Sequence, residues 1–528
     1  MVTAQEPLAT DVGVEVLKSG GNAIDAAVAT AFALAVTYPF AGNLGGGGFI
    51  LARLADGRTT FIDFREAAPA KASRNMYLDA AGKTTRDSLD GWKASGVPGT
   101  VRGLELAHKK YGKKPWGQLL RPAIKLASKG FPVSYSLARS LRSEKRLPEF
   151  EESRRIYLKK GAFFEPDDVI RQPELARTLR RIARSGAKEF YEGQTARLLA
   201  AAMEKNGGLI SLEDLKAYRA VERKPLEGDY KGYRIIGAPP PSSGGVGLIQ
   251  MLGMLDGSGY EKTGHGSAAS IHYMAEVMRR YYADRNQYLA DPDHFAVPLR
   301  GLLDPGYIRS RAATIDRERA TPSAQLGAGQ PTGRESTETT HFNIVDKDGN
   351  AVALTYTLNS GYGSGVTVPG LGFLMNNEMD DFAAKPGSPN LFGLVQGEAN
   401  AIAPHKRPLS SMTPTIILRD GKLDMLLGAP GGSRIITAVL QTFVNVVDFG
   451  MNIQEAIDAP RFHHQWMPDR IEIERGISPD TVDALRAKGH TIDALRYIVI
   501  ARVEGIRIKD GWIEGGSDGR GNGKAAGY

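Results

Sequence analysis

The 528-residue sequence contains no cysteine. This absence excludes disulfide bonds, thiolate zinc sites and a cysteine nucleophile, although it leaves the cellular compartment open. Long hydrophobic runs are also missing. The longest apolar stretch, residues 23–36, is interrupted by Asp25 and Thr30. It is too short to span a membrane and predicts a buried helix instead.

Strong charge of one sign is absent too. The net charge is +8, but residues 339–528 carry 18 Lys and Arg against 21 Asp and Glu, so the basic excess lies before them. It gathers in residues 109–114 and 171–184, which have no interleaved aromatic and glycine pattern. These stretches predict solvated helix faces, and nucleic acid is the less favoured partner.

The first residues show neither a basic segment nor an apolar segment of the kind that makes up an export leader. The sequence by itself therefore predicts either a cytoplasmic protein or one whose export signal has been removed.

Hydrophobic patterning changes along the chain. Period-3.6 patterns dominate the first part and alternating patterns follow residue 339. This order favours layered α/β packing. Residues 314–338, rich in Thr, Ser, Gly, Arg and Pro, predict an exposed linker. The expected helices are 11–18, 22–36, 101–110, 116–129, 174–185, 195–206, 246–255, 267–284 and 433–447. The expected strands are 48–54, 59–63, 340–345, 351–358, 415–419 and 423–427.

Thr339 stands at the boundary between these two regimes, preceded by Glu338. A threonine hydroxyl is a poor nucleophile without an adjacent base. Breaking the Glu338–Thr339 peptide bond would free the α-amino group of Thr339, which can act as that base. Such an amine titrates at about 7.7–8.0 and is partly neutral at physiological pH. The alternative is a threonine that merely opens a strand.

Further groups suit a nucleophile that attacks a carbonyl. The glycines of Gly428-Ala429-Pro430-Gly431-Gly432-Ser433-Arg434 follow a strand and open a helix, where backbone N–H groups can bind an oxyanion. A simple strand-to-helix turn explains them equally well. Thr357 and Asn359 end the next expected strand, which a hairpin would bring back beside Thr339.

Polar clusters predict recognition of an amino acid. Residues 376–382, Asn-Asn-Glu-Met-Asp-Asp-Phe, suit an ammonium group or a divalent metal, but the histidines or Asp-x-Asp loop of a metal site are not clear. The hydroxyls of residues 406–414 suit a carboxylate. Arg65 follows a strand and can clamp a carboxylate through two bonds, although a surface ion pair is the commoner role. A ligand with both groups is an α-amino acid.

Four motifs together resemble the γ-glutamyltranspeptidase (glutathione hydrolase) family of N-terminal-nucleophile hydrolases. The resemblance runs from Gly20 to Tyr528. The motifs are Thr339-Thr340-His341, Asn377-Glu378-Met379-Asp380-Asp381-Phe382, Pro408-Leu409-Ser410-Ser411-Met412 and Pro430-Gly431-Gly432-Ser433-Arg434.

The resemblance implies a precursor that cleaves itself before Thr339 into a large subunit, residues 1–338, and a small subunit, residues 339–528. The two would form one four-layer αββα sandwich and remain together as a heterodimer. Thr339 would be the nucleophile, assisted by Thr357, and Gly431 and Gly432 would supply the oxyanion donors.

The resemblance also assigns the amino-acid pocket and the reaction. Arg65, Ser410 and Ser411 would hold the α-carboxylate of a γ-glutamyl group, and Asn359, Glu378 and Asp381 its α-ammonium. Glutathione and other γ-glutamyl compounds would be donors, and water, amino acids or dipeptides would be acceptors. No metal or organic cofactor is needed.

Residues 385–393 resemble the active-site lid of the family. Phe392 stands where many bacterial members have a tyrosine, so it can cover the pocket without donating a hydroxyl hydrogen bond. Members of the family are usually exported, which implies a periplasmic or secreted enzyme. The alternatives are a related β-lactam acylase, a poly-γ-glutamate depolymerase, or an unprocessed amino-acid-binding paralogue.

Overall fold

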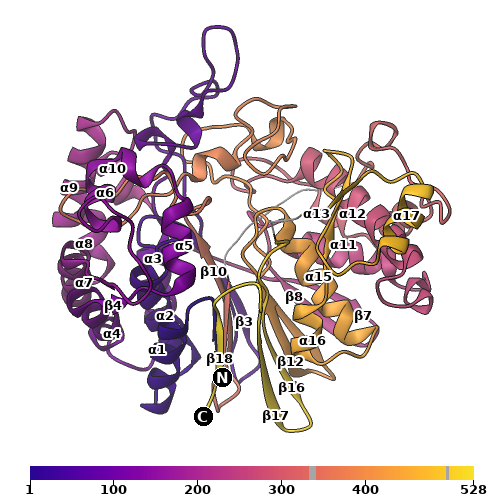
Figure 1. The fold of residues 1–528 in the computed structure, drawn as a ribbon, viewed down its shortest axis with the longest axis horizontal. Helices are drawn as coiled ribbons and strands as arrows, with labels where there is room; N and C mark the ends of the chain where they lie inside the picture. Colours follow the sequence, from indigo (N-terminus) through magenta and orange to yellow (C-terminus); the bar gives the residue numbers. More distant parts are fainter. Residues whose placement is uncertain (332–340, 495–498) are drawn as a thin grey trace.

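The computed structural model describes residues 1–331, 341–494 and 499–528. Two β-sheets lie face to face at the centre, and helices cover both outer faces (Figure 1). The four-layer αββα sandwich implied by the family resemblance is therefore confirmed.

The first sheet has seven strands in the order β18-β1-β9-β10-β2-β3-β6. The second has six strands in the order β17-β16-β12-β11-β8-β7. The strands of the first are β18 (Lys524–Ala526), β1 (Val2–Ala4), β9 (Phe342–Val345), β10 (Ala351–Thr357), β2 (Gly47–Arg53), β3 (Thr59–Phe64) and β6 (Val221–Arg223). Those of the second are β17 (Trp512–Ser517), β16 (Glu504–Lys509), β12 (Lys422–Gly428), β11 (Thr415–Arg419), β8 (Tyr233–Gly237) and β7 (Leu226–Tyr230).

Helices from the first part of the chain cover the first sheet, on the left of Figure 1. They are α1 (Pro7–Lys18), α2 (Ala23–Thr37), α3 (Thr100–Tyr111), α4 (Trp116–Lys129), α5 (Tyr135–Ser143), α6 (Glu151–Tyr157), α7 (Pro173–Ser185), α8 (Ala187–Glu192), α9 (Gln194–Lys205) and α10 (Leu212–Ala217). Two short strands, β4 (Phe131–Pro132) and β5 (Val169–Ile170), pair beside them.

Later helices cover the second sheet. They are α11 (Gly244–Leu255), α12 (Ala268–Tyr288), α13 (Leu299–Leu302), α14 (Pro305–Ala312), α15 (Arg434–Val447), α16 (Ile453–Asp458) and α17 (Pro479–Ala487). A small sheet of β13 (Phe462–His463), β14 (Ile471–Ile473) and β15 (Ile492–Ala494) lies at this side.

Alternation along the strands explains the layering. On β10, Val352 and Leu354 pack against the first helical layer, whereas Ala351 and Ala353 face the second sheet. Successive side chains of a strand point to opposite faces, so the consecutive apolar residues 351–354 are typical of a strand buried on both sides. The layer between the sheets contains Phe49 of β2 and other apolar side chains.

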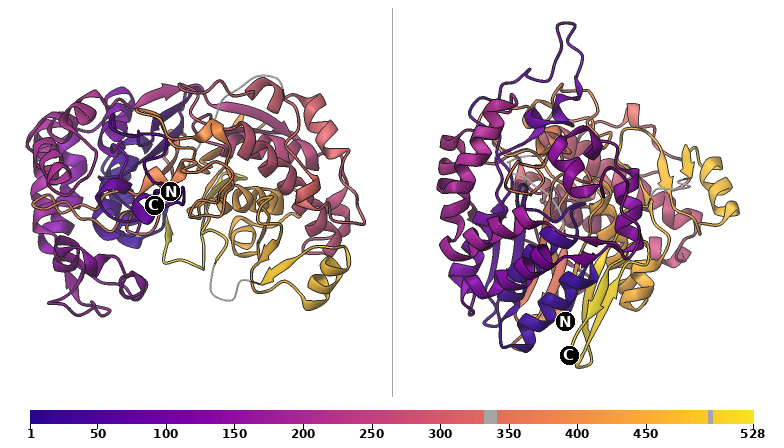
Figure 2. Two further views of the ribbon diagram at one scale, coloured as in Figure 1. Left: turned by 90° about the horizontal axis from the view of Figure 1, so that it is seen from above. Right: turned by 60° about the vertical axis from the view of Figure 1, so that its left-hand side comes forward.

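The chain interleaves the two parts of the sequence. Strand β1 lies between β18 and β9, so the two termini are neighbours (Figure 2). In the same sheet β10 pairs with β2, and in the second sheet β11 pairs with β8. Both large sheets thus combine strands from before residue 331 with strands from after residue 341, and neither of them lies wholly within one stretch.

The register brings several loops to one end of the sandwich. Thr357 pairs with Gly47, and Phe64 pairs with Gly48, so the ends of β10 and β3 share one sheet edge. In the second sheet Thr415 pairs with both Leu427 and Gly237. The loops before β11, after β12 and after β8 therefore gather at one edge as well.

The expected elements are present with small shifts at their ends. Helix α1 begins at Pro7 because Glu6 caps the N–H groups of Leu8 and Ala9, at 3.1 and 2.9 Å. Helix α12 continues to Tyr288, past the expected end at residue 284. The described part of the expected linker is not wholly exposed, because Ser323 is buried and the indole N–H of Trp466 donates to its carbonyl at 3.1 Å.

No helix in the described ranges is both long and apolar enough to cross a membrane.

Candidate functional site

Thr357 ends β10 at the edge where the loops gather. Its Oγ1 accepts a hydrogen bond from the backbone N–H of Asn359 at 2.8 Å. Asn359 has a φ of 75° and donates its side-chain amide to the carbonyl of Asn377 at 3.0 Å. This hydrogen bond joins the end of β10 to the acidic segment, residues 376–382. Glu338 and Thr339 lie outside the described residues.

The glycine turn joins β12 to α15. Gly431 has a φ of 150° and Gly432 a φ of 59°. A Cβ atom on Gly432 would lie 2.5 Å from Cδ1 of Phe392, so only glycine allows that ring to approach. Among the described residues, neither the Gly431 nor the Gly432 N–H donates a hydrogen bond. The predicted oxyanion donors are thus placed at a helix start, beneath the predicted lid residue.

The predicted arginine and acidic residues form one buried cluster. Arg65 is fully buried and donates from Nη2 to Oδ2 of Asp381 at 2.6 Å. Its Nη1 donates to Glu378, and Oε2 of Glu66 lies 3.6 Å from Nη1. The structure thus brings together residues that the sequence assigned separately to a carboxylate and an ammonium, and it adds Glu66.

Burial sets the ionisation of these acids. It raises the pKa of Glu378 well above its usual range and also raises that of Asp381, with Arg65 opposing both shifts. Burial raises the pKa of Glu66 to about 7, again opposed by Arg65. Low-dielectric surroundings disfavour a charged carboxylate, so three acids around one guanidinium favour a further positive charge.

The two predicted serines precede β11 and are both buried. The hydroxyl of Ser243 donates to the carbonyl of Ser410 at 3.0 Å. Arg285 of α12 donates from Nε to the Ser243 hydroxyl at 2.9 Å and from Nη2 to the Ser411 hydroxyl at 3.4 Å. The loop after β8 therefore holds the Ser410 backbone, and a buried guanidinium contacts the Ser411 hydroxyl.

Sequence reasoning did not identify Glu66, Ser243 or Arg285. Glu66 directly follows Arg65, and Ser243 lies in the conspicuous Pro-Pro-Pro-Ser-Ser-Gly-Gly loop, so both positions carried a signal. Arg285 continues a helical pattern in which an arginine is ordinarily assigned to the solvated face.

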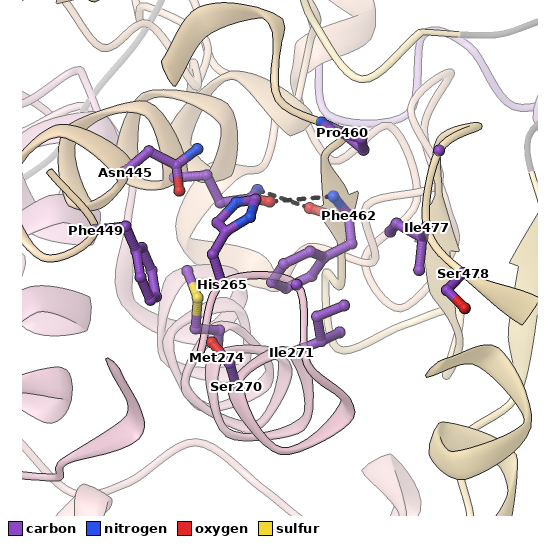
Figure 3. A pocket seen from close by; sticks show the side chains of 13 residues that line it. His265, Ser270, Ile271, Met274, Asn445, Phe449, Pro460, Phe462, Ile477 and Ser478 are labelled. Carbon is purple, nitrogen blue, oxygen red and sulfur yellow. Dashed lines mark hydrogen bonds between the residues drawn. The ribbon is translucent and has the colours of Figure 1, made fainter. Parts of the chain in front are cut away.

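The described residues contain no group of three or more His, Cys, Asp or Glu side chains placed to hold a metal ion. A cavity of about 250 Å³ between α12 and α15 lies among His265, Met274, Asn445, Phe449 and other residues (Figure 3). None of the predicted site residues lines it. It is separate from the gathered loops.

The fold and the gathered loops can be compared with known proteins. The cephalosporin acylase from Bacillus halodurans is similar in structure, with a TM-score of 0.89 and 28% identity over 100% of this chain and 95% of that chain. The γ-glutamyltranspeptidase of Helicobacter pylori is 46% identical with a TM-score of 0.61, covering 62% of this chain and 94% of that chain. The architecture is that of the N-terminal-nucleophile hydrolases.

Sequence comparison gives the family. The family model described as γ-glutamyltranspeptidase matches residues 9–528. The glutathione hydrolase proenzyme of Escherichia coli (strain K12) is 51% identical over 524 residues, which are 98% of this chain and 90% of that protein. The chain belongs to the γ-glutamyltranspeptidase family and is an enzyme of that family.

Proposed function

We propose that this chain is a self-processing γ-glutamyl hydrolase and transferase that acts on glutathione and other γ-glutamyl compounds. The observation that carries the proposal is the buried Arg65–Glu378–Asp381 cluster, which lies at the same end of the sandwich as Thr357 and the glycine turn. A γ-glutamyl group presents both charges of an amino acid to such a cluster and extends its amide away from them.

Processing before Thr339 would give subunits of residues 1–338 and 339–528. The strand arrangement supports this position: β9 begins at Phe342, three residues after Thr339, and pairs with β10, which ends at Thr357. The interleaved sheets would keep the two subunits together as a heterodimer. The solved H. pylori chain covers 62% of this chain, close to the share of residues 1–338.

The reaction would be acyl transfer. The free amine of Thr339 takes the proton from its own hydroxyl as Oγ attacks the γ-glutamyl carbonyl. The N–H groups of Gly431 and Gly432 stabilise the tetrahedral oxyanion. The C–N bond breaks, the amine leaves with the proton, and a γ-glutamyl ester remains on Thr339. Water or the amine of an acceptor amino acid or dipeptide then attacks the ester and restores the hydroxyl.

The proposed amino-acid pocket, called the clamp, would orient the γ-glutamyl donor for this attack. Arg65, with the hydroxyls of Ser410 and Ser411, would bind the α-carboxylate. Asn359, Glu378 and Asp381 would bind the α-ammonium. The excess of buried carboxylates supports the ammonium site, because an added cation lowers their pKa and offsets the cost of keeping them charged.

Mass analysis under denaturing conditions tests the processing step. Of the 57.0 kDa chain, a cut before Thr339 predicts a fragment of about 20.5 kDa, in proportion to 190 of 528 residues. Thr339→Ala should remain a single species and lose turnover of a chromogenic γ-glutamyl anilide. A parent protein that stays uncut at 57.0 kDa would support an unprocessed amino-acid-binding protein instead.

Replacement of Asp381 by asparagine tests the pocket. Asp381→Asn should weaken γ-glutamyl turnover at least about 100-fold, since a buried charge pair is broken, while cleavage still occurs. Asp229→Asn, an exposed carboxylate on β7, is the matched control. Near-normal turnover by Asp381→Asn would contradict the assignment.

The structural similarity to a cephalosporin acylase keeps a second acyl group under consideration. A poly-γ-glutamate depolymerase is a further alternative. Turnover of a cephalosporin amide or of internal poly-γ-glutamate bonds, in place of a free γ-glutamyl anilide, would favour these readings. We also propose a periplasmic or extracellular location, which cell fractionation with an antibody to the small subunit would test.

A further inference from the structure

The lid loop, residues 385–393, is tied at its tip to both sides of the site. Its tip residues Leu391 and Phe392 lie between the acidic segment and the glycine turn. Two side chains outside the loop make these ties, Asp380 on one side and Gln465 on the other.

Asp380 holds the tip from the acidic side. It is buried and accepts a hydrogen bond from the backbone N–H of Leu391 at 3.0 Å through Oδ2. Its Oδ1 accepts from the hydroxyl of Ser88 at 3.0 Å. The next residue is Asp381 of the clamp, so one short segment contacts both the lid and Arg65.

Gln465 holds the tip from the glycine side. Its Nε2 donates to the carbonyl of Phe392 at 3.0 Å. Its Oε1 accepts from the hydroxyl of Ser433 at 2.7 Å, and Ser433 directly follows Gly432. The amide therefore bridges the lid to the turn that would bind the oxyanion.

Apolar packing contributes little to the position of the tip on the Asp380 side. The side chain of Leu391 is 46% exposed. A cavity of about 180 Å³ lies behind the loop, bounded by Ser88, Asp380, Leu391 and other residues. A loop with a space behind it is positioned by its hydrogen bonds rather than by close packing.

We propose that Asp380 and Gln465 are positioning residues that latch the lid loop, and with it the Phe392 ring, over the glycine turn. The inference rests on the proposed function, because the latch matters for turnover only if the γ-glutamyl donor binds beneath Phe392. Releasing the tip weakens retention of the donor and exposes the loop, while the reacting groups keep their places.

Steady-state kinetics and limited proteolysis of the processed enzyme test this proposal together. Asp380→Leu removes both acceptors at similar size, whereas Asp380→Asn keeps an acceptor for Leu391. For Asp380→Leu we expect a five- to tenfold higher KM for a chromogenic γ-glutamyl anilide, in line with about one lost hydrogen bond, and a kcat within about twofold of the parent. Cleavage inside residues 385–393 should accelerate to a similar extent.

Controls separate the latch from a general loss of structure. Asp380→Asn should restore KM and protease resistance to within about twofold of the parent. Lys385→Met, which removes an exposed bond to the Gly82 carbonyl at the start of the loop, should change neither quantity. Gln465→Glu, which replaces the Nε2 donor by an oxygen, should reproduce the effects of Asp380→Leu and supplies the test if that variant does not fold.

The latch proposal would be overturned if Asp380→Leu kept both the KM and the loop cleavage rate of the parent. If only Gln465→Glu folds, the same result for that variant would overturn it. If the parent itself does not turn over the anilide, the proposed function fails. Proteolysis of the loop then still decides whether these side chains hold the tip.

Discussion

Replacing Arg65 by methionine is the single substitution that should perturb the site most strongly. The guanidinium is fully buried between Glu378 and Asp381, and Glu66 lies 3.6 Å away. Methionine keeps much of the length of the arginine side chain and removes its positive charge. Breaking a buried ion pair by removing one partner costs about 3–5 kcal/mol, because the other charge remains buried without compensation. The free energy of unfolding at pH 8 should fall by about this amount.

The loss should depend on pH in a definite direction. The pKa values of Glu378 and Asp381 are already raised by burial, and Arg65 opposes the rise. Without Arg65 the folded protein binds still more protons than the unfolded chain, so the free energy of unfolding falls as pH rises. At pH 5 the acids of the folded variant are neutral, and the difference from the parent shrinks.

Urea unfolding at pH 5 and pH 8 measures both quantities. The triple variant Arg65→Met/Glu378→Gln/Asp381→Asn should recover most of the lost stability at pH 8, since it leaves no uncompensated charge on the two paired acids. Turnover of the γ-glutamyl anilide should be lost in both variants. Equal destabilisation by Arg65→Met at the two pH values would refute the electrostatic reasoning.

Three further substitutions have distinct outcomes. Gly432→Ala should lower the free energy of unfolding by about 1–2 kcal/mol because of its positive φ, and it should also displace the Phe392 ring, so that KM rises and kcat falls. The control Gly421→Ala, at φ 73° with open space around it, should show only the backbone cost. Matching kinetics for the two variants would contradict this expectation. Thr357→Val removes the hydroxyl that would assist Thr339 and should slow the appearance of the 20.5 kDa fragment about two- to tenfold, the effect of one lost hydrogen bond. Unchanged processing on a mass time course would remove Thr357 from the mechanism. Asp380→Asn should stabilise the protein by at most about 4 kcal/mol at pH 8 and by little at pH 4. Burial raises the pKa of Asp380 from 3.8 to about 7, so its ionisation above that pH destabilises the fold. A difference in urea unfolding that does not depend on pH would contradict this reasoning.

Local patterns were sufficient for the central elements. The expected strands 340–345 and 351–358, separated by a short turn, predicted the hairpin of β9 and β10, whose register follows from that turn. Strands β1 and β18 were not predicted. Each has three residues, and Val2 pairs with Ala526 at the other end of the chain, so no window of sequence contains the pairing.

The site was predictable where its chemistry is concentrated in motifs. The acidic segment 376–382 and the glycine turn stood out from their residues, and the family resemblance assigned Glu378 and Asp381 within that segment. Arg285 was missed because its burial depends on the loop after β8 and the loop before β11 meeting at one sheet edge. The direct pairing of Arg65 with Glu378 and Asp381 was missed for the same reason, because the partners are more than 300 residues apart in the sequence.

The interleaved sheets explain how a bond inside the chain could be broken without loss of the site. Arg65 precedes the proposed cleavage point, whereas Glu378 and Asp381 follow it. What joins the two stretches is the pairing of β1 with β9 and of β2 with β10, together with the apolar layers on both faces of that sheet. Backbone hydrogen bonds along these strands persist when the covalent link is cut. Cleavage before Thr339 can therefore supply the missing base while the clamp, which needs residues from both sides, stays assembled.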